Sequence, residues 1–259
     1  MKFKKVGVVL DHKSHVASKA YNEILKRYGF AEVDENDNYD VILAIGGDGV
    51  MLRALHRFMK HTVPIYGMNR GSIGFLMNKY SLDDILAKLE NAKETVIYPL
   101  EMTSTDVHGT VTVATAINEI ALLRETNQAA HIQISINDRV ELDKMVGDGI
   151  LVASPAGSSA YNFAAYGPIL PLNSKMLALT PLAPFRPRRW HGALLTHNSK
   201  ISFEVLSPTK RPVGASADYV GCRNVKFIEI IERSDLPLTL LFDKEYTFEE
   251  RLMREQFLT

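Results

Sequence analysis

The first 70 residues alternate short apolar runs with helical patterns, and this alternation restricts the fold more than any other feature. Apolar runs at Val6–Leu10, Val41–Ile45 and Pro64–Met68 have the length and composition of strands buried on both faces. Residues 14–28 and 51–59, which lie between the runs, have helical periodicity. This βαβαβ order predicts an α/β, Rossmann-like domain with an open parallel sheet, whose ligands are expected at the carboxyl ends of its strands.

The pattern changes near residue 98, after one more helix expected at about Leu82–Asn91. Apolar and polar residues then alternate, as in Val111–Ile117 and Ile132–Ile136, which is typical of half-buried strands. The second part of the chain is therefore expected to be β-rich and sandwich-like.

Two domains follow from this change. Residues 1–98 are expected to form the α/β domain, and residues 99–236 the β-rich domain, to which NAD binding and oligomerisation are assigned below. Residues 237–259 offer a strand and a closing helix, and we expect this segment to return to the first domain and complete it.

The overall charge gives no reason to expect nucleic acid as a partner. Lys plus Arg and Asp plus Glu number 30 each among 259 residues, so the formal net charge is zero. No stretch approaches the length of a membrane span, and no membrane partner is expected.

The single cysteine, Cys222, excludes an intrachain disulfide and a multi-cysteine metal site. The apolar stretch near the start ends at Asp11, which is too short for the core of a signal peptide. A cytoplasmic location is the expectation.

Residues 46–49 read Gly-Gly-Asp-Gly between a strand and a helix. No Lys-Ser/Thr follows as in a P-loop, and the G-x-G-x-x-G dinucleotide fingerprint is missing. Asp48 has two interpretations: an N-cap of the following helix, or a carboxylate that the glycines present to a ligand crevice. Gly71 and Gly74, which follow the third strand, favour a ligand site at that edge.

Three later motifs also have two interpretations. Asn118 and Glu119 are expected within a strand, where their side chains point to opposite faces. One of them can then be exposed without any special role, and the alternative is a role in a binding site. Asp148 precedes a glycine between apolar runs, which is typical of a hairpin turn. A short helix is expected at about Gly157–Tyr166. Its small residues and hydroxyls either leave room for a flat ligand on which Tyr161 can stack, or belong to a helix start that packs under a neighbouring strand.

Taken together and in this order, four motifs resemble the NAD kinase family: "GGDG" at 46–49, "NRGSIGFL" at 69–76, "NE" at 118–119 and "GDGILVASPAGSSAY" at 147–161. The stretch "ILPLNSKMLALTPLAPFRPRRW" is similar to the bacterial, particularly the alphaproteobacterial, branch. The resemblance implies transfer of a phosphoryl group from ATP or another donor to the 2′-hydroxyl of the adenosine ribose of NAD, which makes NADP. It also implies a divalent metal ion, with Mg²⁺ expected and not fixed by the protein alone, and a homodimer or homotetramer.

The resemblance assigns roles residue by residue. Asp48 is the implied catalytic residue that contacts the reacting ribose, and Asp148 is expected near the nicotinamide half. The implied NAD-binding residues are Asp48, Gly49, Phe75, Asn118, Glu119, Asp148, Ala156, Ser159, Ala160 and Tyr161. The implied phosphate-donor residues are Gly46, Gly47, Arg53, Asn69 and Gly71.

The chain departs from the family pattern at several positions. Val50 stands where the family usually has Thr, so a hydroxyl is missing beside the glycine turn. Ser154, Ala156 and Ser159 stand where the long motif normally has threonines. Asp218 precedes Tyr219 where the family has Asp-Gly, which weakens the assignment of Asp218.

Two other functions share part of this pattern. Diacylglycerol and sphingoid lipid kinases also contain "GGDG", but they need an apolar acceptor cavity, whereas the acceptor motifs here are polar. A dinucleotide-binding regulator without turnover is the non-enzymatic alternative, which the missing hydroxyls at Val50 and Ala156 keep open.

Overall fold

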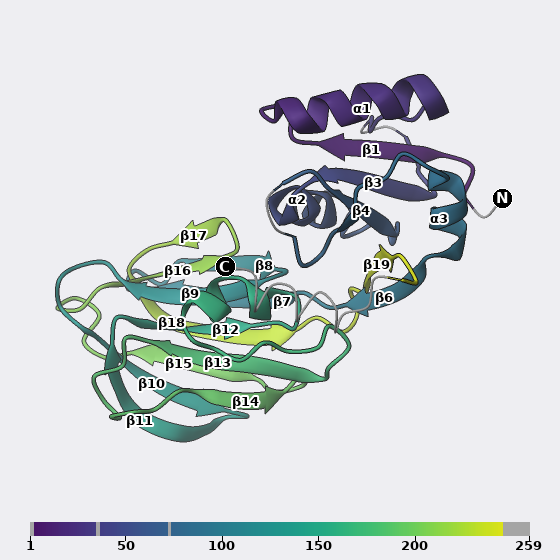
Figure 1. Ribbon diagram of the computed structural model, residues 1–259. Helices are drawn as coiled ribbons and strands as arrows, with labels where there is room; N and C mark the ends of the chain where they lie inside the picture. Colours follow the sequence, from purple (N-terminus) through teal and green to yellow (C-terminus); the bar gives the residue numbers. More distant parts are fainter. Residues whose placement is uncertain (1–2, 35–36, 72–73, 246–259) are drawn as a thin grey trace. The chain divides into compact units, whose positions relative to one another are not determined.

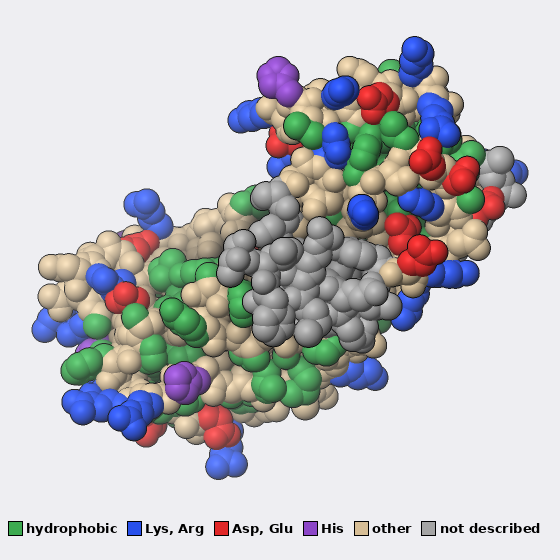
Figure 2. All heavy atoms as spheres, viewed as in Figure 1, with side chains coloured by type: hydrophobic (Ala, Val, Ile, Leu, Met, Phe, Trp, Pro, Cys, Tyr) green, Lys and Arg blue, Asp and Glu red, His purple; other side chains and the backbone are tan. Residues whose placement is uncertain are grey.

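The computed structural model describes residues 3–34, 37–71 and 74–245 (Figure 1). The chain divides into two compact units, Met1–Ile97 with Leu236–Thr259, and Tyr98–Asp235. On the face drawn in Figure 2, acidic and basic side chains are interspersed on the described residues, in keeping with the formal net charge of zero. Within the described residues, no helix is long and apolar enough to cross a membrane.

The first unit is built on a seven-stranded sheet. Its strands are β1 (Val6–Leu10), β2 (Ala31–Glu32), β3 (Val41–Gly46), β4 (Ile65–Asn69), β5 (Asn78–Lys79), β6 (Lys93–Ile97) and β19 (Leu238–Phe242). The main path runs β2-β1-β3-β4-β19-β6, with β5 beside β4. All pairs are parallel except β6 with β19, so the predicted open α/β sheet is confirmed.

Strand β19 brings the end of the described chain into this sheet. Leu240 pairs with Ile65 of β4 on one side and with Thr95 of β6 on the other. The predicted return of the C-terminal segment to the first domain is therefore confirmed, while the closing helix predicted after it lies outside the described residues.

Among the described residues, three helices accompany the sheet: α1 (His15–Tyr28), α2 (Asp48–Phe58) and α3 (Ile85–Asn91). Helix α1 starts at Ser14, whose hydroxyl accepts the N–H of Ala17, and stops at Gly29, which has a φ of 72°. Helix α3 begins three residues later than predicted. Alternate residues of β3 pack with α1 in one core cluster, and because side chains alternate along a strand, the others face the side on which α2 packs.

The second unit consists of two six-stranded sheets. One has the order β11 (Arg139–Gly147), β10 (Ala130–Ile136), β15 (Ile201–Val205), β18 (Val225–Glu232), β7 (Leu100–Asp106) and β8 (Val111–Ala116). The other has the order β14 (Ala193–Thr196), β13 (Met176–Leu182), β12 (Gly149–Ala153), β9 (Glu119–Arg124), β16 (Val213–Ala217) and β17 (Val220–Cys222). All pairs are antiparallel.

One buried core joins the two sheets. Met102 and Phe203 of the first sheet belong to the same core cluster as Leu122 and Ile150 of the second. The sandwich-like domain predicted from alternating residues is confirmed, since each strand turns one row of apolar side chains inward.

Two local predictions in this unit are wrong. The Asp148 turn is not a hairpin, because β11 pairs in one sheet and β12 in the other, so the chain changes sheets at Asp148. The helix expected at 157–166 is split into a 3-10 turn, Gly157–Ser159, and α4 (Tyr161–Ala164). Ala160 interrupts it with a ψ of −125°, which is outside the helical range.

Candidate functional site

The glycine turn at residues 46–49 joins the carboxyl end of β3 to α2. Gly47 is the N-cap, without a side-chain cap bond, and Asp48 is the first residue of the helix. The interpretation of Asp48 as an N-cap is therefore wrong. Its side chain is held instead by backbone N–H groups of the loop that follows β4.

The carboxylate of Asp48 is held by the loop that follows β4. Oδ2 accepts the backbone N–H of Phe75 at 2.8 Å, and Oδ1 accepts the N–H of Leu76 at 3.0 Å. Each oxygen of the carboxylate thus has a backbone partner, and the two bonds fix the plane of the group. The arrangement fixes a half-buried acceptor at the carboxyl edge of the parallel sheet.

The two glycine-containing loops approach each other closely. A Cβ built on Gly71 would lie 3.2 Å from the Cα of Gly47, and Asn69 accepts the N–H of Gly71 at 2.9 Å. A Cβ on Gly49, by contrast, would meet no heavy atom of the described residues within 4 Å. The turn is thus tight against the loop that follows β4, hereafter the second loop, whereas no described residue crowds Gly49.

Val50, where a hydroxyl was expected, packs beneath the turn. Its side chain is 3% exposed, and its Cγ2 lies 2.2 Å from the position of a Cβ on Gly46. Gly46 therefore admits no side chain here, and residue 50 contributes to packing.

Arg53, assigned to the donor by resemblance, lies on an exposed part of α2. It follows Asp48 by five residues, which is about 140° around a helix. The two side chains leave the helix on different faces.

Asn118 lies in the bend between β8 and β9, and Glu119 is the first residue of β9, so neither is in the middle of a strand. The expectation that one of them is simply exposed is wrong, because the Oδ1 of Asn118 and the Oε2 of Glu119 are both buried. Neither oxygen has a hydrogen-bond partner among the described residues. Unsatisfied buried acceptors are costly, and two in succession indicate a place for a ligand with N–H or O–H donors.

Asp218 shapes this bend, residues 117–119, from the turn between β16 and β17. Its carboxylate accepts the N–H of Ile117 at 2.7 Å, of Asn118 at 3.0 Å and of Glu119 at 3.3 Å. Its own backbone is left-handed, with a φ of 49°. Asp218 therefore fixes the backbone from which the side chains of Asn118 and Glu119 project.

Burial, with a smaller contribution from the negative charge of Asp218, raises the pKa of Glu119 to about 7. The carboxyl group thus changes charge near neutral pH, unlike an exposed glutamate.

The segment after β12 packs directly on the bend. Ser154 donates its hydroxyl to the carbonyl of Ile117 at 2.6 Å, and its N–H to the carbonyl of Asn118 at 2.9 Å. A Cβ on Gly157 would lie 2.1 Å from that same Asn118 oxygen, so the two segments are in backbone contact. Ala156 is buried, Ser159 and Ala160 are half-buried, and Tyr161 is 39% exposed.

Asp148 lies away from this group of residues. Glu119 pairs with Ala153 at one end of β12, whereas Asp148 precedes the other end, roughly 17 Å along the strand. Its carboxylate accepts the Nε–H of Arg124 at 2.5 Å. Within one chain, therefore, Asp148 belongs to a different surface.

Sequence reasoning missed the anchoring roles of Asp218 and Ser154 and passed over Arg70, which lies between Asn69 and Gly71. The backbone N–H groups that Asp218 binds are about a hundred residues away in the chain, so no local sequence pattern predicts this contact. Arg70 stands inside the second loop, and its position was the available signal.

The described residues contain no group of three or more His, Cys, Asp or Glu side chains that could hold a metal ion.

Both parts of the chain match models of known protein families. Residues 4–96 match the ATP-NAD kinase N-terminal domain, and residues 117–214 match the ATP-NAD kinase C-terminal domain.

Full-length relatives give the same result. The NAD kinase of Xylella fastidiosa (strain 9a5c) is 48% identical over 93% of this chain and 92% of its own, and that of Rickettsia rickettsii (strain Sheila Smith) is 44% identical over 99% of each. An NAD kinase from Archaeoglobus fulgidus, solved in complex with ATP, has a TM-score of 0.78 at 25% identity, covering 99% of this chain and 100% of that one. Yeast NADH kinase, solved with NADH, has a TM-score of 0.84 at 18% identity, covering 100% and 88%, and shares the fold. The chain therefore belongs to the ATP-NAD kinase family.

Proposed function

We propose that this protein transfers the terminal phosphoryl group of ATP to the 2′-hydroxyl of the adenosine ribose of NAD, which yields NADP. The observation that carries the proposal is the Asp48 carboxylate, oriented by two backbone N–H groups beside a glycine turn. Family membership supplies the reaction, and the geometry supports Asp48 as the group that acts on the hydroxyl.

Asp48 accepts the hydrogen bond of the 2′-hydroxyl and then its proton. The hydroxyl oxygen attacks the terminal phosphorus, the bond from that phosphorus to the bridging oxygen breaks, and the electron pair leaves with ADP. Phosphoryl transfer relies on positioning and charge neutralisation, so a pre-oriented acceptor is the protein's main contribution to the attacking side.

The glycine turn and the second loop receive the donor phosphates. Gly46, Gly47, Gly49 and Gly71 allow close backbone approach, which is supported by the open space at Gly49. Asn69 completes this set, and Arg53 is proposed for it on the family resemblance alone, because its side chain leaves α2 on a different face from that of Asp48.

The adenosine of NAD occupies the bend at Asn118 and Glu119. Two buried oxygens that have no hydrogen-bond partner among the described residues suit the hydrogen-bond donors of an adenosine. Ala156, Ser159 and Ala160 offer small side chains against the purine, and the aromatic ring of Tyr161 offers a stacking surface. Asp148 is proposed for the nicotinamide half of an NAD held by another subunit, which suits its distance from Glu119 along β12.

A divalent ion, Mg²⁺, fits this site as a companion of the donor. The protein offers no cluster of three metal-ligating side chains among its described residues, and Mg²⁺ commonly takes its ligands from substrate phosphates and water. When bound, it neutralises charge on the donor phosphates.

We further propose a homodimer or homotetramer that works in the cytoplasm in NADP biosynthesis. An exposed apolar strip on the first sheet of the second unit supports self-association: Val111 is 59% exposed, Val113 is 61% exposed, and Phe227 is 38% exposed. Thr105 of β7 pairs with Val111 on one side and with Phe227 on the other, so Val111 and Phe227 lie in one row of the sheet. Val113, two residues after Val111, lies on the same face of β8. Light scattering after size exclusion checks the assembly.

The activity is tested by incubating the protein with ATP, MgCl₂ and NAD and following NADP. Diacylglycerol replaces NAD in a parallel reaction. NADP formation is expected; stable NAD binding without NADP after long incubation, or phosphorylation of the lipid alone, would contradict the proposal.

A further inference from the structure

Arg70 is attached to the glycine turn through its backbone. It follows β4, whose Asn69 pairs with Gly46 of β3, and its N–H donates to the Gly46 carbonyl at 2.8 Å. Its position relative to the turn is therefore fixed by the pairing of two buried parallel strands.

The guanidinium of Arg70 has no anionic partner among the described residues. Its Cζ lies 4.1 Å from the centroid of the Tyr80 ring, and its Nε is buried with no hydrogen-bond acceptor in the described part of the chain. An arginine has five N–H donors in a planar fork, which suits phosphate oxygens. A cation held on an aromatic face beside a glycine turn, with one donor unsatisfied among the described residues, has the chemistry that suits an anion.

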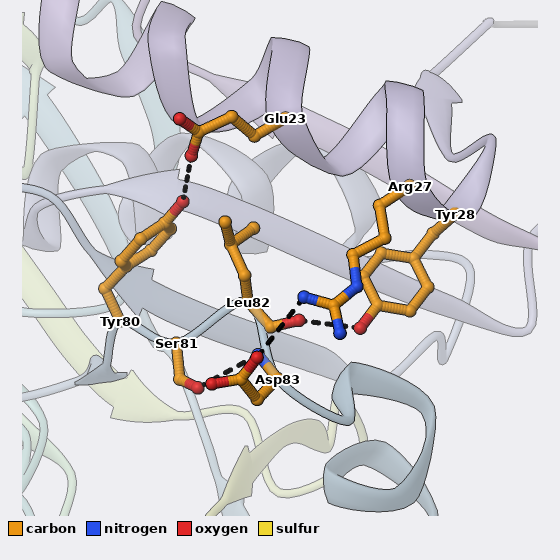
Figure 3. Close-up of polar contacts among 7 residues, drawn as sticks. All are labelled: Glu23, Arg27, Tyr28, Tyr80, Ser81, Leu82 and Asp83. Carbon is orange, nitrogen blue, oxygen red and sulfur yellow. Dashed lines mark hydrogen bonds and ion pairs between the residues drawn. The ribbon is translucent and has the colours of Figure 1, made fainter.

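The Tyr80 ring is itself held by α1. The hydroxyl of Tyr80 donates to Glu23 at 3.2 Å (Figure 3). In the same segment, Tyr28 donates to the Leu82 carbonyl at 2.6 Å, and Arg27 pairs with Asp83 at 3.2 Å (Figure 3). Because exposed pairs add little stability, the consequence of these contacts is chiefly geometric: they fasten residues 80–83 to α1 and fix the platform beneath Arg70.

We propose that Arg70 binds a phosphate of the phosphoryl donor through its guanidinium, and that Tyr80 is a positioning residue which holds this guanidinium by stacking. The proposal rests on the proposed kinase function and adds a donor contact that neither the glycines nor Arg53 provide. It concerns the phosphate chain, which ATP shares with other polyphosphate donors.

The test separates the donor from the acceptor. KM is measured for ATP at saturating NAD and for NAD at saturating ATP, and tripolyphosphate is titrated as an inhibitor competitive with ATP. For Arg70→Gln we expect the KM for ATP and the inhibition constant of tripolyphosphate to rise about 10-fold to 100-fold, the worth of a charge-assisted hydrogen bond, with the KM for NAD within about twofold.

Matched variants exclude a general effect of charge or packing. Arg57→Gln removes an exposed arginine whose guanidinium also lies over a ring, 5.6 Å from the Phe58 centroid, and we expect it to leave both KM values unchanged. Tyr80→Phe keeps the ring and loses the bond to Glu23, so it stays near wild type, whereas Tyr80→Ala raises the KM for ATP alone. Arg70→Lys keeps the charge but loses the planar fork of donors, so its KM for ATP is expected to lie between those of wild type and Arg70→Gln.

Two results overturn the inference while the kinase function stands: Arg70→Gln behaving like Arg57→Gln, or the KM for NAD rising as much as the KM for ATP. If Arg70→Gln is shown by its melting temperature to be unfolded, Arg70→Lys decides, and an unchanged inhibition constant for tripolyphosphate in that variant contradicts the inference. A wild-type protein that forms no NADP would contradict the proposed function instead.

Discussion

The carboxylate of Asp48 accepts the backbone N–H of Phe75 at 2.8 Å, so the glycine turn after β3 and the loop after β4 are joined through one side chain. The neighbouring N–H of Leu76 binds the other oxygen at 3.0 Å. A group expected to act on a hydroxyl is thus oriented before any substrate arrives, which is what positioning demands of a phosphoryl-transfer site.

Replacing Asp48 by Asn is expected to lower kcat by about 100-fold to 10,000-fold, the usual contribution of a positioned proton acceptor. The amide keeps the size of the side chain and loses the acceptor charge. NADP formation in single turnovers measures the effect, and NAD binding by calorimetry serves as the control, with an affinity within a few-fold of wild type. An Asp48→Asn variant that makes NADP at the wild-type rate excludes this role.

Glu119 is expected to make stability depend on pH. Its pKa is raised to about 7 in the folded protein, so the folded state holds a proton that the unfolded state releases at lower pH. The associated stability is fully present below the unfolded pKa of 4.5 and is lost as pH rises through 7, with a total change on the order of 3 kcal/mol.

Glu119→Gln removes this titration. Urea unfolding measures the free energy of unfolding of both proteins at pH 5 and pH 8. The value for the variant relative to that for wild type should be higher at pH 8 than at pH 5. A stability difference between the two proteins that is the same at both pH values would show that Glu119 does not titrate in this range.

Gly49→Ala is expected to separate stability from activity. No described heavy atom lies within 4 Å of the added methyl, so the free energy of unfolding should stay the same or rise by up to about 1 kcal/mol. The methyl would, however, stand where the donor phosphates approach, so the KM for ATP should rise. Steady-state kinetics and thermal unfolding measure the two effects, and an unchanged KM would argue against phosphate binding at Gly49.

Gly157→Ala provides the opposite case. The methyl would lie 2.1 Å from the carbonyl oxygen of Asn118, a backbone atom that cannot rotate away. We expect a loss of about 1–3 kcal/mol from overpacking, measured by urea unfolding. A variant as stable as wild type would mean that the 154–161 segment is not in firm contact with the bend.

Asp218→Asn tests whether the bend depends on its distant anchor. The variant weakens three backbone hydrogen bonds and removes a neighbouring charge, so the KM for NAD should rise and the pKa of Glu119 should fall. The fall in the pKa of Glu119 is measured from the pH dependence of NAD binding. The KM for ATP is the control and should not change. Equal changes in both KM values would indicate a general loss of structure.

Much of the fold follows from local patterns. The buried strands β1, β3 and β4 coincide with the apolar runs, because a strand covered on both faces needs apolar residues throughout. Helix α1 begins and ends where Ser14 and Gly29 predict. The apolar run near the C-terminus predicted the strand β19 and its return to the first unit. The family motifs indicated the loops and turns that lie close together within each unit.

The errors fall where distant contacts decide the structure. Asp48 looked like an N-cap from its neighbours, but its partners, Phe75 and Leu76, come from the next loop. The turn at Asp148 looked like a hairpin, yet β11 and β12 pair with strands of different sheets. Local spacing contains no information about which sheet a strand joins.

The sequence by itself determined the periodicities and the chemistry: parallel strands ending in glycine turns, a β-rich second unit, and polar residues of the family's motifs. Only the tertiary structure decided what each polar side chain does. Hydrogen-bond partners such as Asp218 with Asn118, or the platform of Tyr80 beneath Arg70, are separated along the chain. Their contacts form when the buried strands pack, and the cost of leaving polar groups unpaired then selects the partners.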